Sequence, residues 1–310
     1  MGAVNALIVS HAGSDVAMIP EVADHLISSG GKRIRPMLLL ATASMFDYRG
    51  DGDVTLATAV EYMHTATLLH DDVVDESDMR RGRPAARKIW GNQASVLVGD
   101  FLLGQAFKLM VEVGSLEALD VFASAAATIS EGEVRQLAGA KNLSVGEAHY
   151  MAVIEAKTAA LFAAATAAGP IIAGAAEHRA ALEGFGRNLG LAFQLIDDVL
   201  DYSGTAEDLG KNVGDDLREG KATLPVLLAY ARGDEDDRAF WRRCIEAGDV
   251  REGDVGLAAR KVRETGALDE ATARAWRFAD GAREDLARAP AGEMRDILDE
   301  VIGFTVSRLH

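Results

Sequence analysis

Two acidic clusters of the same design interrupt apolar stretches of this chain. They read DDVVD at Asp71–Asp75 and DDVLD at Asp197–Asp201. On an α-helix, residues three and four apart share one face, so the three carboxylates of each cluster lie close together and repel one another. The flanking sequences ATLL and LAFQLI are apolar, which is not typical of a solvated helix face. The pattern therefore predicts largely apolar helices whose carboxylates need a positively charged partner.

Magnesium fits these clusters as that partner. Mg²⁺ prefers hard oxygen ligands, keeps several waters, and is usually held by a few carboxylates together with substrate phosphates. An EF-hand calcium loop is excluded at the first cluster, because position six is Glu76 instead of glycine. We therefore predict that the two clusters face each other across a cavity and hold metal ions that clamp a diphosphate.

Composition limits the partners of the chain. Its 310 residues are 49% hydrophobic and 26% charged, which is ample for a globular core. The formal net charge of −16 argues against nucleic acid and anionic lipid as general partners. The one cysteine, Cys244, cannot form an intrachain disulfide. Together with the lack of a basic secretory n-region, this predicts a cytoplasmic protein.

One uncharged stretch, residues 158–176, is long enough to span a bilayer. It is rich in alanine instead of leucine, and Gly169 and Pro170 interrupt it. We therefore interpret it as a buried helix, a turn and the start of another helix, with no membrane span. Strand-like alternation is scarce and no Gly/Ser linker divides the chain. The sequence predicts one all-helical domain over residues 1–310, with its cavity between helices.

Basic residues accompany both acidic clusters. They occur as GKRIR at residues 31–35, as Arg80-Arg81 after the first cluster, and as Lys157, Lys211 and Lys221. Arginine matches phosphate oxygens with a planar fork, and lysine acts as a point charge. This distribution suits two diphosphates, one bound through metal and one held by cations alone. Gln194 shares a helix face with the second cluster, where it could orient a metal-bound group or meet a developing cation with its carbonyl oxygen.

Other common site types are not indicated. His64 stands alone in an apolar helix, and no H-E-x-x-H or Cys/His spacing accompanies it, so zinc is not expected. The sequence also contains no P-loop, dinucleotide fingerprint or Gly-x-Ser-x-Gly motif.

Six motifs together resemble those of the trans-isoprenyl diphosphate synthases. They read GKRIRP, HTATLLHDDVVDESDMRRG, GEVRQL, KTA, FQLIDDVLDY and GKNVGDDLREGKATLP. Within that family the chain is most similar to the bacterial long-chain polyprenyl synthases of the octaprenyl diphosphate synthase type. The resemblance covers nearly the whole chain in order, with a somewhat short N-terminus. It implies an all-α, single-domain isoprenoid-synthase bundle around a central cavity, usually a homodimer, with three Mg²⁺ ions per active site.

The reaction implied by the resemblance is prenyl transfer. Isopentenyl diphosphate is added head-to-tail to an allylic diphosphate such as farnesyl or geranyl diphosphate. Metal ions and cations stabilise the charge that grows on the leaving diphosphate, the double bond attacks the allylic cation, and proton loss completes the addition. The cavity must exclude water, because water would quench the cation. The expected product is long, in the octaprenyl to decaprenyl class used for quinone side chains.

The resemblance also implies roles for individual residues. The metal ligands would be Asp71, Asp72, Asp75, Asp197, Asp198 and Asp201. The allylic diphosphate would be held by Arg80, Lys157, Lys211 and Lys221, and isopentenyl diphosphate by Lys32, Arg35, His64 and Arg81. Lys157, Thr158 and Gln194 would face the allylic cation.

Product length is expected to depend on residues just before the first cluster. Ala66 and Thr67 precede Asp71 by five and four residues, roughly one helical turn of about 5.4 Å. Related short-chain synthases commonly carry bulky aromatics in this neighbourhood as a floor, whereas both residues here are small. We therefore expect an open tunnel that permits a long product. The alternative is that Ala66 only permits close helix packing.

Three other functions stay open from sequence. A class I terpene cyclase normally carries one DDxxD and a different second metal motif, and it needs no second diphosphate site. A non-catalytic subunit of a heteromeric synthase would be expected to have lost several acidic or basic motif residues, and all remain here. A shorter-chain farnesyl or geranylgeranyl synthase differs only in product length. Peripheral membrane contact for product release is also left open.

Overall fold

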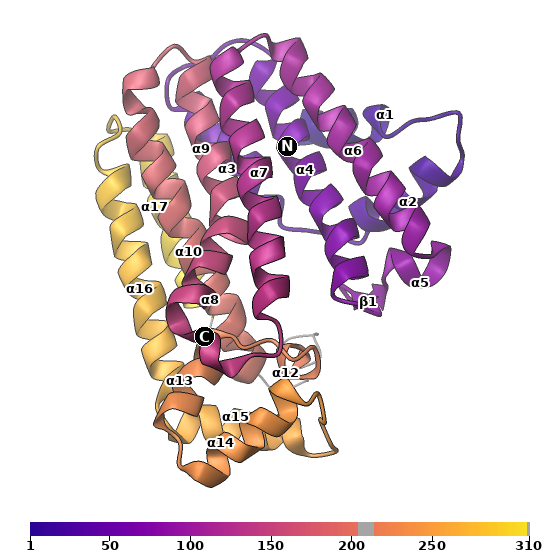
Figure 1. Ribbon diagram of the computed structural model, residues 1–310. Coiled ribbons are helices and arrows are strands. Elements are labelled where there is room, and N and C mark those ends of the chain that lie inside the picture. Colours follow the sequence, from indigo (N-terminus) through magenta and orange to yellow (C-terminus); the bar gives the residue numbers. More distant parts are fainter. Residues whose placement is uncertain (204–213, 309–310) are drawn as a thin grey trace. The chain divides into compact units, whose positions relative to one another are not determined.

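The computed structural model describes residues 1–203 and 214–308 of the chain (Figure 1). Within these ranges the protein is helical apart from a two-stranded antiparallel hairpin of β1 (Met79–Arg80) and β2 (Arg83–Pro84). The prediction of an all-α fold is confirmed. Residue contacts divide the chain into two compact units. One domain over residues 1–310 stays a prediction.

Unit 1 comprises Met1–Ala126, Leu161–Gly186 and Ala287–Leu298. Its first segment contains seven helices or parts of helices and the hairpin. In chain order these are α1 (Gly2–His11), α2 (Met18–Ser28), α3 (Ile34–Ser44), α4 (Gly52–Val74), the hairpin, α5 (Ala86–Trp90), α6 (Asn92–Val113) and the first half of α7 (Leu116–Gly139). It also holds most of α9 (Ala160–Ile172), the short helix η3 (Ala176–His178) and the starts of α10 (Arg179–Ser203) and α17 (Glu293–Ser307).

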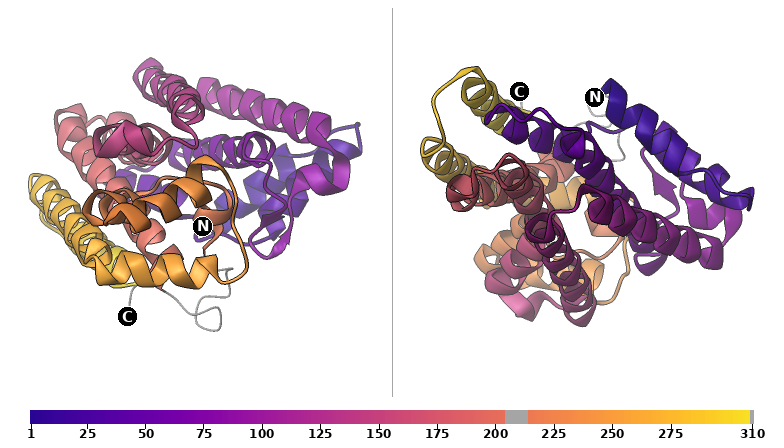
Figure 2. Two further views of the ribbon diagram at one scale, coloured as in Figure 1. Left: turned by 60° about the horizontal axis from the view of Figure 1, so that its bottom comes forward. Right: turned by 90° about the horizontal axis from the view of Figure 1, so that it is seen from above.

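Helix α4 is the central helix of unit 1. It packs against α1, α3 and α6, and α4 and α6 run side by side in Figures 1 and 2. Eight consecutive residues, 56–63, are buried, so the helix is covered on all sides there. Among them is a carboxylate, Glu61, which forms an ion pair with Arg33. The C-terminal end of this helix carries the first aspartate cluster.

Helix α9 lies in the interior of unit 1 because its residues are small. A Cβ atom added at Gly169 would lie 2.2 Å from Thr42 Oγ1, so only glycine allows this approach to α3. Contrary to the predicted break at Gly169 and Pro170, the helix continues to Ile172. Pro170 stands in the last turn, where it removes one hydrogen bond, and Ala173 N still donates to Gly169 O. By length and composition, residues 92–113 and 143–172 would reach across a bilayer, but 44% and 56% of their apolar windows are buried in the protein.

Unit 2 comprises Ala127–Ala160, Arg187–Leu286 and Asp299–His310. Besides the remaining parts of α7, α10 and α17, it contains η1 (Leu143–Val145), α8 (Gly146–Ile154), the π-helix η2 (Glu155–Ala159), α12 (Asp215–Arg218), α13 (Leu224–Arg232), α14 (Glu235–Trp241), the π-helix η4 (Arg242–Glu246), α15 (Asp254–Glu264) and α16 (Ala267–Leu286). Helix α13 is the central helix of unit 2 and packs against α8, α14, α15 and α16.

A carboxylate fixes the start of α15 in unit 2. Asp254 accepts two hydrogen bonds from the guanidinium of Arg243, at 2.8 and 2.9 Å, and a third from Arg251 N at 2.6 Å. These bonds hold the start of the helix against η4. The single cysteine, Cys244, is buried beside them, and burial raises its thiol pKa to about 11, so it is not a reactive thiolate.

Candidate active site

The first aspartate cluster occupies the last turn of α4. Asp72 is fully buried, and Arg80 on β1 donates from Nε to its Oδ1 at 2.8 Å. Burial raises the pKa of Asp72, and the neighbouring Arg80 opposes that rise. Its second oxygen, Oδ2, is also buried and accepts no hydrogen bond from the part of the chain that the structure describes. Asp71 and Asp75 are half-buried. A buried carboxylate oxygen without a donor is a position that a cation would satisfy.

Cations of unit 1 surround His64. Burial and the charges of Arg35, Arg81, Arg80 and Arg33 keep the pKa of His64 well below its usual value, so the imidazole is neutral at pH 7. It therefore acts as a hydrogen-bonding group and contributes no charge. The structure thus brings together three of the four residues predicted to hold isopentenyl diphosphate. The fourth, Lys32, is exposed on the segment that leads into α3.

Local contacts hold these arginines in place. Arg81 has a left-handed backbone, with φ of 53°, and its guanidinium donates to Gly30 O. The guanidinium carbon of Arg35 lies 4.5 Å from the centre of the Phe162 ring, a cation–π contact. Arg33 differs, because buried Glu61 already neutralises it. This division between Arg33 and its neighbours was not visible in the GKRIR sequence.

The second cluster lies on α10, and its three aspartates have different partners. Asp198 is buried and accepts hydrogen bonds at both oxygens, from Tyr150 OH at 2.5 Å and from Gln194 Nε2 at 2.8 Å. Burial raises its pKa to about 7 although both donors oppose the rise. Asp197 Oδ1 forms an ion pair with Arg308 at 2.9 Å.

Asp201 is held by backbone instead of side chains. Its two oxygens accept from the amides of Asp215 and Asp216, each at 3.2 Å, at the start of α12. Asp216 is a further carboxylate of this group, since its pKa is raised by burial and by the charges of Asp198 and Asp201. The sequence prediction missed Asp216, although it stands in the quoted GKNVGDDLREGK motif. It also missed Tyr150 and Arg308, which carry no local signal.

The three residues predicted to face the allylic cation lie on two adjoining elements. Lys157 and Thr158 belong to the π-helix η2, a helix type frequent at functional sites. Thr158 Oγ1 donates to Gln194 Oε1 at 2.8 Å, and Gln194 in turn donates to Asp198. Gln194 thus orients Asp198, and the second lone pair of its carbonyl oxygen remains for a developing cation, so both predicted roles stay predictions.

Two of the three lysines predicted to hold the allylic diphosphate can be placed. Lys157 Nζ lies 2.7 Å from Glu133 Oε2 on α7. Lys221 forms an ion pair with Glu219 at 2.5 Å, and its charge lowers the pKa of Asp198 and Asp216. Lys221 therefore lies near the second cluster, and its contact with the allylic diphosphate stays a prediction. Lys211 lies outside the described residues.

The carboxylates fit magnesium only together with other ligands. Within residues 1–203 and 214–308, no group of three or more His, Cys, Asp or Glu side chains forms a preformed metal cage. Mg²⁺ needs no such cage, because waters and substrate phosphates complete its coordination. Where bound, the ion would neutralise developing phosphate charge. Asp72 suits this role best, since its buried Oδ2 accepts no hydrogen bond from the described residues, whereas the buried Oδ1 of Asp197 lies 2.9 Å from the guanidinium of Arg308.

The two residues proposed for chain length are both ordered on α4. Ala66 is buried, and the hydroxyl of half-buried Thr67 donates to His64 O at 2.8 Å. Burial of Ala66 agrees with either predicted role, the wall of a tunnel or close helix packing. Its part in product length therefore stays a prediction.

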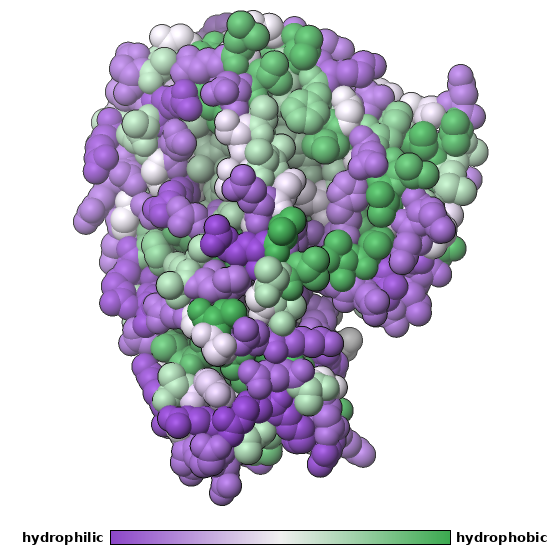
Figure 3. All heavy atoms as spheres, in the orientation of Figure 1, coloured by the Kyte–Doolittle hydropathy of each residue, from purple (hydrophilic) through white to green (hydrophobic). Residues whose placement is uncertain are grey.

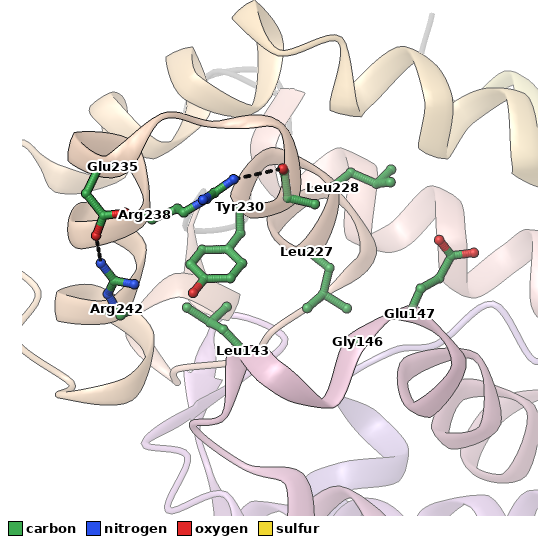
Figure 4. A pocket seen from close by; sticks show the side chains of 10 residues that line it. Leu143, Gly146, Glu147, Leu227, Leu228, Tyr230, Glu235, Arg238 and Arg242 are labelled. Atoms are coloured by element: carbon green, nitrogen blue, oxygen red, sulfur yellow. Dashed lines mark hydrogen bonds and ion pairs between the residues drawn. The ribbon is translucent and has the colours of Figure 1, made fainter.

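Unit 2 also contains a pocket. It has a volume of about 450 Å³ and includes Leu143, Leu227, Tyr230 and Arg238 in its lining (Figure 4). Arg242 at its rim forms an ion pair with Glu235. None of the predicted site residues that the structure describes is among its lining residues. The predicted chemistry therefore stays with the acidic and basic groups described above.

Comparison with known proteins agrees with the chemistry of these groups. The family model "Polyprenyl synthetase" matches residues 16–262. The chain is 50% identical to octaprenyl diphosphate synthase of Escherichia coli K12 over 252 residues, which are 81% of this chain and 78% of that protein. Magnesium dependence is general in this family.

Two crystal structures are similar over the full chain. A decaprenyl diphosphate synthase from Rhodobacter capsulatus has a TM-score of 0.94 and 50% identity, and covers 100% of this chain and 96% of its own. A polyprenyl synthase from Caulobacter crescentus CB15, complexed with calcium and isoprenyl diphosphate, has a TM-score of 0.96 and 50% identity, with coverage of 100% and 95%. This chain is therefore a prenyltransferase and belongs to the polyprenyl synthetase family, among its long-chain members.

Proposed function

We propose that this protein synthesises a long-chain trans-polyprenyl diphosphate, in the octaprenyl to decaprenyl class, from isopentenyl diphosphate and an allylic diphosphate such as farnesyl or geranyl diphosphate. The observation that carries the proposal is that the acidic and the basic side chains offer two different ways to bind a diphosphate. Asp72 has a buried oxygen without a donor among the described residues, whereas Arg35 and Arg81 beside neutral His64 form a cationic group separate from it. One diphosphate bound through metal and one bound without it is what this condensation requires.

The residues of the chain would act on the two substrates differently. Asp72 and Asp197 would hold Mg²⁺, for which the family suggests three ions, and Arg80, Lys157, Lys211 and Lys221 would neutralise the allylic diphosphate as it leaves. Arg35, Arg81, Lys32 and His64 would hold isopentenyl diphosphate. Bound Mg²⁺ supplies Lewis-acid stabilisation of the leaving group. The alanine-rich, buried helix α9 provides water-free surroundings of the kind that an allylic cation requires.

A product assay tests the proposal directly. The purified chain is incubated with labelled isopentenyl diphosphate, farnesyl diphosphate and Mg²⁺, and the extracted products are separated by chromatography. We expect a ladder that ends in products of about eight to ten isoprene units. A ladder ending at geranylgeranyl length would identify a short-chain synthase. A cyclised hydrocarbon made without isopentenyl diphosphate would identify a terpene cyclase, and no product at all would identify a non-catalytic subunit.

We further propose that the protein forms a homodimer through α6. Leu97, Gly104 and Val111 repeat every seven residues on this helix, and all three are exposed, the leucine and valine by 66% and 63%. Apolar side chains of α6 are visible at the surface in Figure 3. Light scattering on a size-exclusion column should give twice the mass of 32.9 kDa. Leu97→Glu should give the monomer, with Arg263→Glu at an exposed position of α15 as the charged control.

We also propose that the protein acts in the cytoplasm. The buried, unpaired Cys244 supports a reducing, cytoplasmic location. Fractionation of cells that express the tagged chain tests this, and also tests peripheral membrane contact for product release. A share of the protein that moves from the membrane fraction to the supernatant at high salt would support such contact.

A further inference from the structure

The proposed diphosphate ligand Lys157 is held by a carboxylate that no assigned role includes. Its Nζ lies 2.7 Å from Oε2 of Glu133, and the two side chains are only 17% and 21% exposed. A partly buried ion pair of this geometry restrains both side chains more than an exposed pair does. Glu133 is on the second part of α7, which belongs to the same unit as the π-helix that carries Lys157.

A glycine lets the two elements approach. A Cβ atom added at Gly132 would lie 2.6 Å from Ala156 Cβ and 3.3 Å from Lys157 N. No side chain fits at that distance, so the backbone of α7 at Gly132 packs directly against the π-helix. The neighbouring Glu133 is thereby brought within ion-pair distance of Lys157. Gly132 and Glu133 thus act together, one by its lack of a side chain and the other by its charge.

We propose that Glu133 is a positioning residue for Lys157, and that it orients the ammonium group toward the allylic diphosphate. The inference rests on the proposed role of Lys157. Lysine carries its charge on a flexible four-carbon stem and loses considerable rotamer freedom when it binds. A carboxylate that restrains the stem beforehand reduces this loss and sets the direction of the ammonium group. The negative charge of Glu133 also weakens the attraction of Lys157 for phosphate, so the two effects predict opposite results when Glu133 is removed.

The experiment compares Glu133→Ala with Glu131→Ala in the full-length enzyme. Glu131 is a matched control, because it lies on the same helix, is exposed, and forms no ion pair with any residue that the structure describes. The readouts are the KM values for farnesyl and isopentenyl diphosphate, kcat, and the thermal midpoint. We expect Glu133→Ala to raise the KM for the allylic substrate about tenfold, less than the hundredfold that a misplacement of about 1 Å can cost. The KM for isopentenyl diphosphate and the thermal midpoint should not change.

Two further variants separate positioning from a structural role. Glu133→Gln keeps an oxygen acceptor for Nζ and should recover part of the lost affinity. In the Lys157→Ala background, Glu133→Ala should cost nothing more, because a residue that acts through Lys157 has no effect without it.

Three results would overturn the inference. Equal losses from Glu133→Ala with and without Lys157 would show a structural role, and a lower allylic KM would show that Glu133 only weakens the cation. If Glu133→Ala behaved like Glu131→Ala while Lys157→Ala raised the allylic KM, only the positioning role would be lost. If Lys157→Ala itself left the allylic KM unchanged, the proposed role of Lys157 would fail as well.

Discussion

The two aspartate clusters have the same sequence pattern but obtain their partners in different ways. In the first, Asp72 is paired with Arg80, eight residues further along the chain on the adjoining hairpin. In the second, Asp198 is bonded to Tyr150, 48 residues away, and Asp197 is paired with Arg308 near the C-terminal end. The difference teaches that one motif can be stabilised by a local contact in one place and only by distant parts of the chain in another.

The clusters also differ in which carboxylates remain available. Asp198 and Asp201 accept hydrogen bonds at both oxygens, from side chains and from backbone amides respectively. Asp197 has one partner among the described residues, the ion pair with Arg308, whose guanidinium also donates to Phe193 O at 3.3 Å. We therefore expect Asp197 to bind metal directly and its two companions to hold the surroundings in shape.

The largest effect should come from removing the carboxylates predicted to bind metal. Asp71→Ala and Asp197→Ala should each lower kcat at least about a hundredfold, the loss typical of deleting one preorganised group that stabilises transition-state charge. Steady-state rates in saturating Mg²⁺ measure this, with exposed Asp120→Ala as the control. Near-normal rates in either folded variant would remove that cluster from the site.

A stability measurement tests the distant partner of the second cluster. Tyr150→Phe removes the donor to Asp198 Oδ2 and leaves a buried polar oxygen without that bond. The free energy of unfolding in urea should fall by about 1–3 kcal/mol. Tyr48→Phe removes a hydroxyl at a half-buried position and should cost less. Equal costs would mean that the short bond to Asp198 contributes nothing special.

Substrate affinities test whether the basic residues serve two separate diphosphates. Arg35→Ala should raise the KM for isopentenyl diphosphate about tenfold, equivalent to about 1.4 kcal/mol, and leave the allylic KM nearly unchanged. Arg80→Ala and Lys211→Ala should do the reverse. Initial rates at varied concentrations of each substrate give both constants. Equal shifts for both substrates in all three variants would indicate a general cationic field instead of two sites.

Product length tests the helix that carries the first cluster. Ala66→Phe places a large ring about one turn before Asp71 on α4. If Ala66 lines the tunnel, the major product should shorten by several isoprene units while the first condensation continues. Chromatography of extracted products measures this, and Ala59→Phe, buried further up the same helix, controls for overpacking. An unchanged product length in a stable, active variant would place the floor elsewhere, such as near Phe107 and Met110.

The smallest effect concerns a carboxylate outside both clusters. The guanidinium of Arg243 keeps the pKa of Asp254 below its usual value, so its ionised form stabilises the fold. This stabilisation is complete above the unfolded pKa of about 3.9 and is lost as the pH falls through the lower folded value. Asp254→Asn should therefore lower the free energy of unfolding by about 1 kcal/mol at pH 7, with the difference shrinking below about pH 4.

Urea titrations at several pH values measure that difference. Asp249→Asn provides a surface comparison, because its carboxylate pairs with exposed Arg251 and should matter little. A difference between the Asp254 variant and the natural chain that stays constant down to pH 2 would show that the charge of Asp254 is not what stabilises α15.

Much of the site could be predicted from local sequence. The spacing of the aspartates, the apolar flanks and the helix period placed the first cluster at the end of α4 and the second on α10, as observed. Arg80 follows its cluster so closely that a short connection had to keep the two together. The all-α fold was predictable for the same reason, because helical periodicity is a property of neighbouring residues.

Only the tertiary structure decided which side chains are charged and which already have an ion-pair partner. Burial among four arginines makes His64 neutral, Glu61 removes Arg33 from the cationic group, and Gly132 allows Glu133 to reach Lys157. The sequence by itself determined the helices and the residue types that can bind metal and diphosphate. The pairing of those residues depended on desolvation and on contacts between segments far apart in the chain, and neither leaves a periodic signal in the sequence.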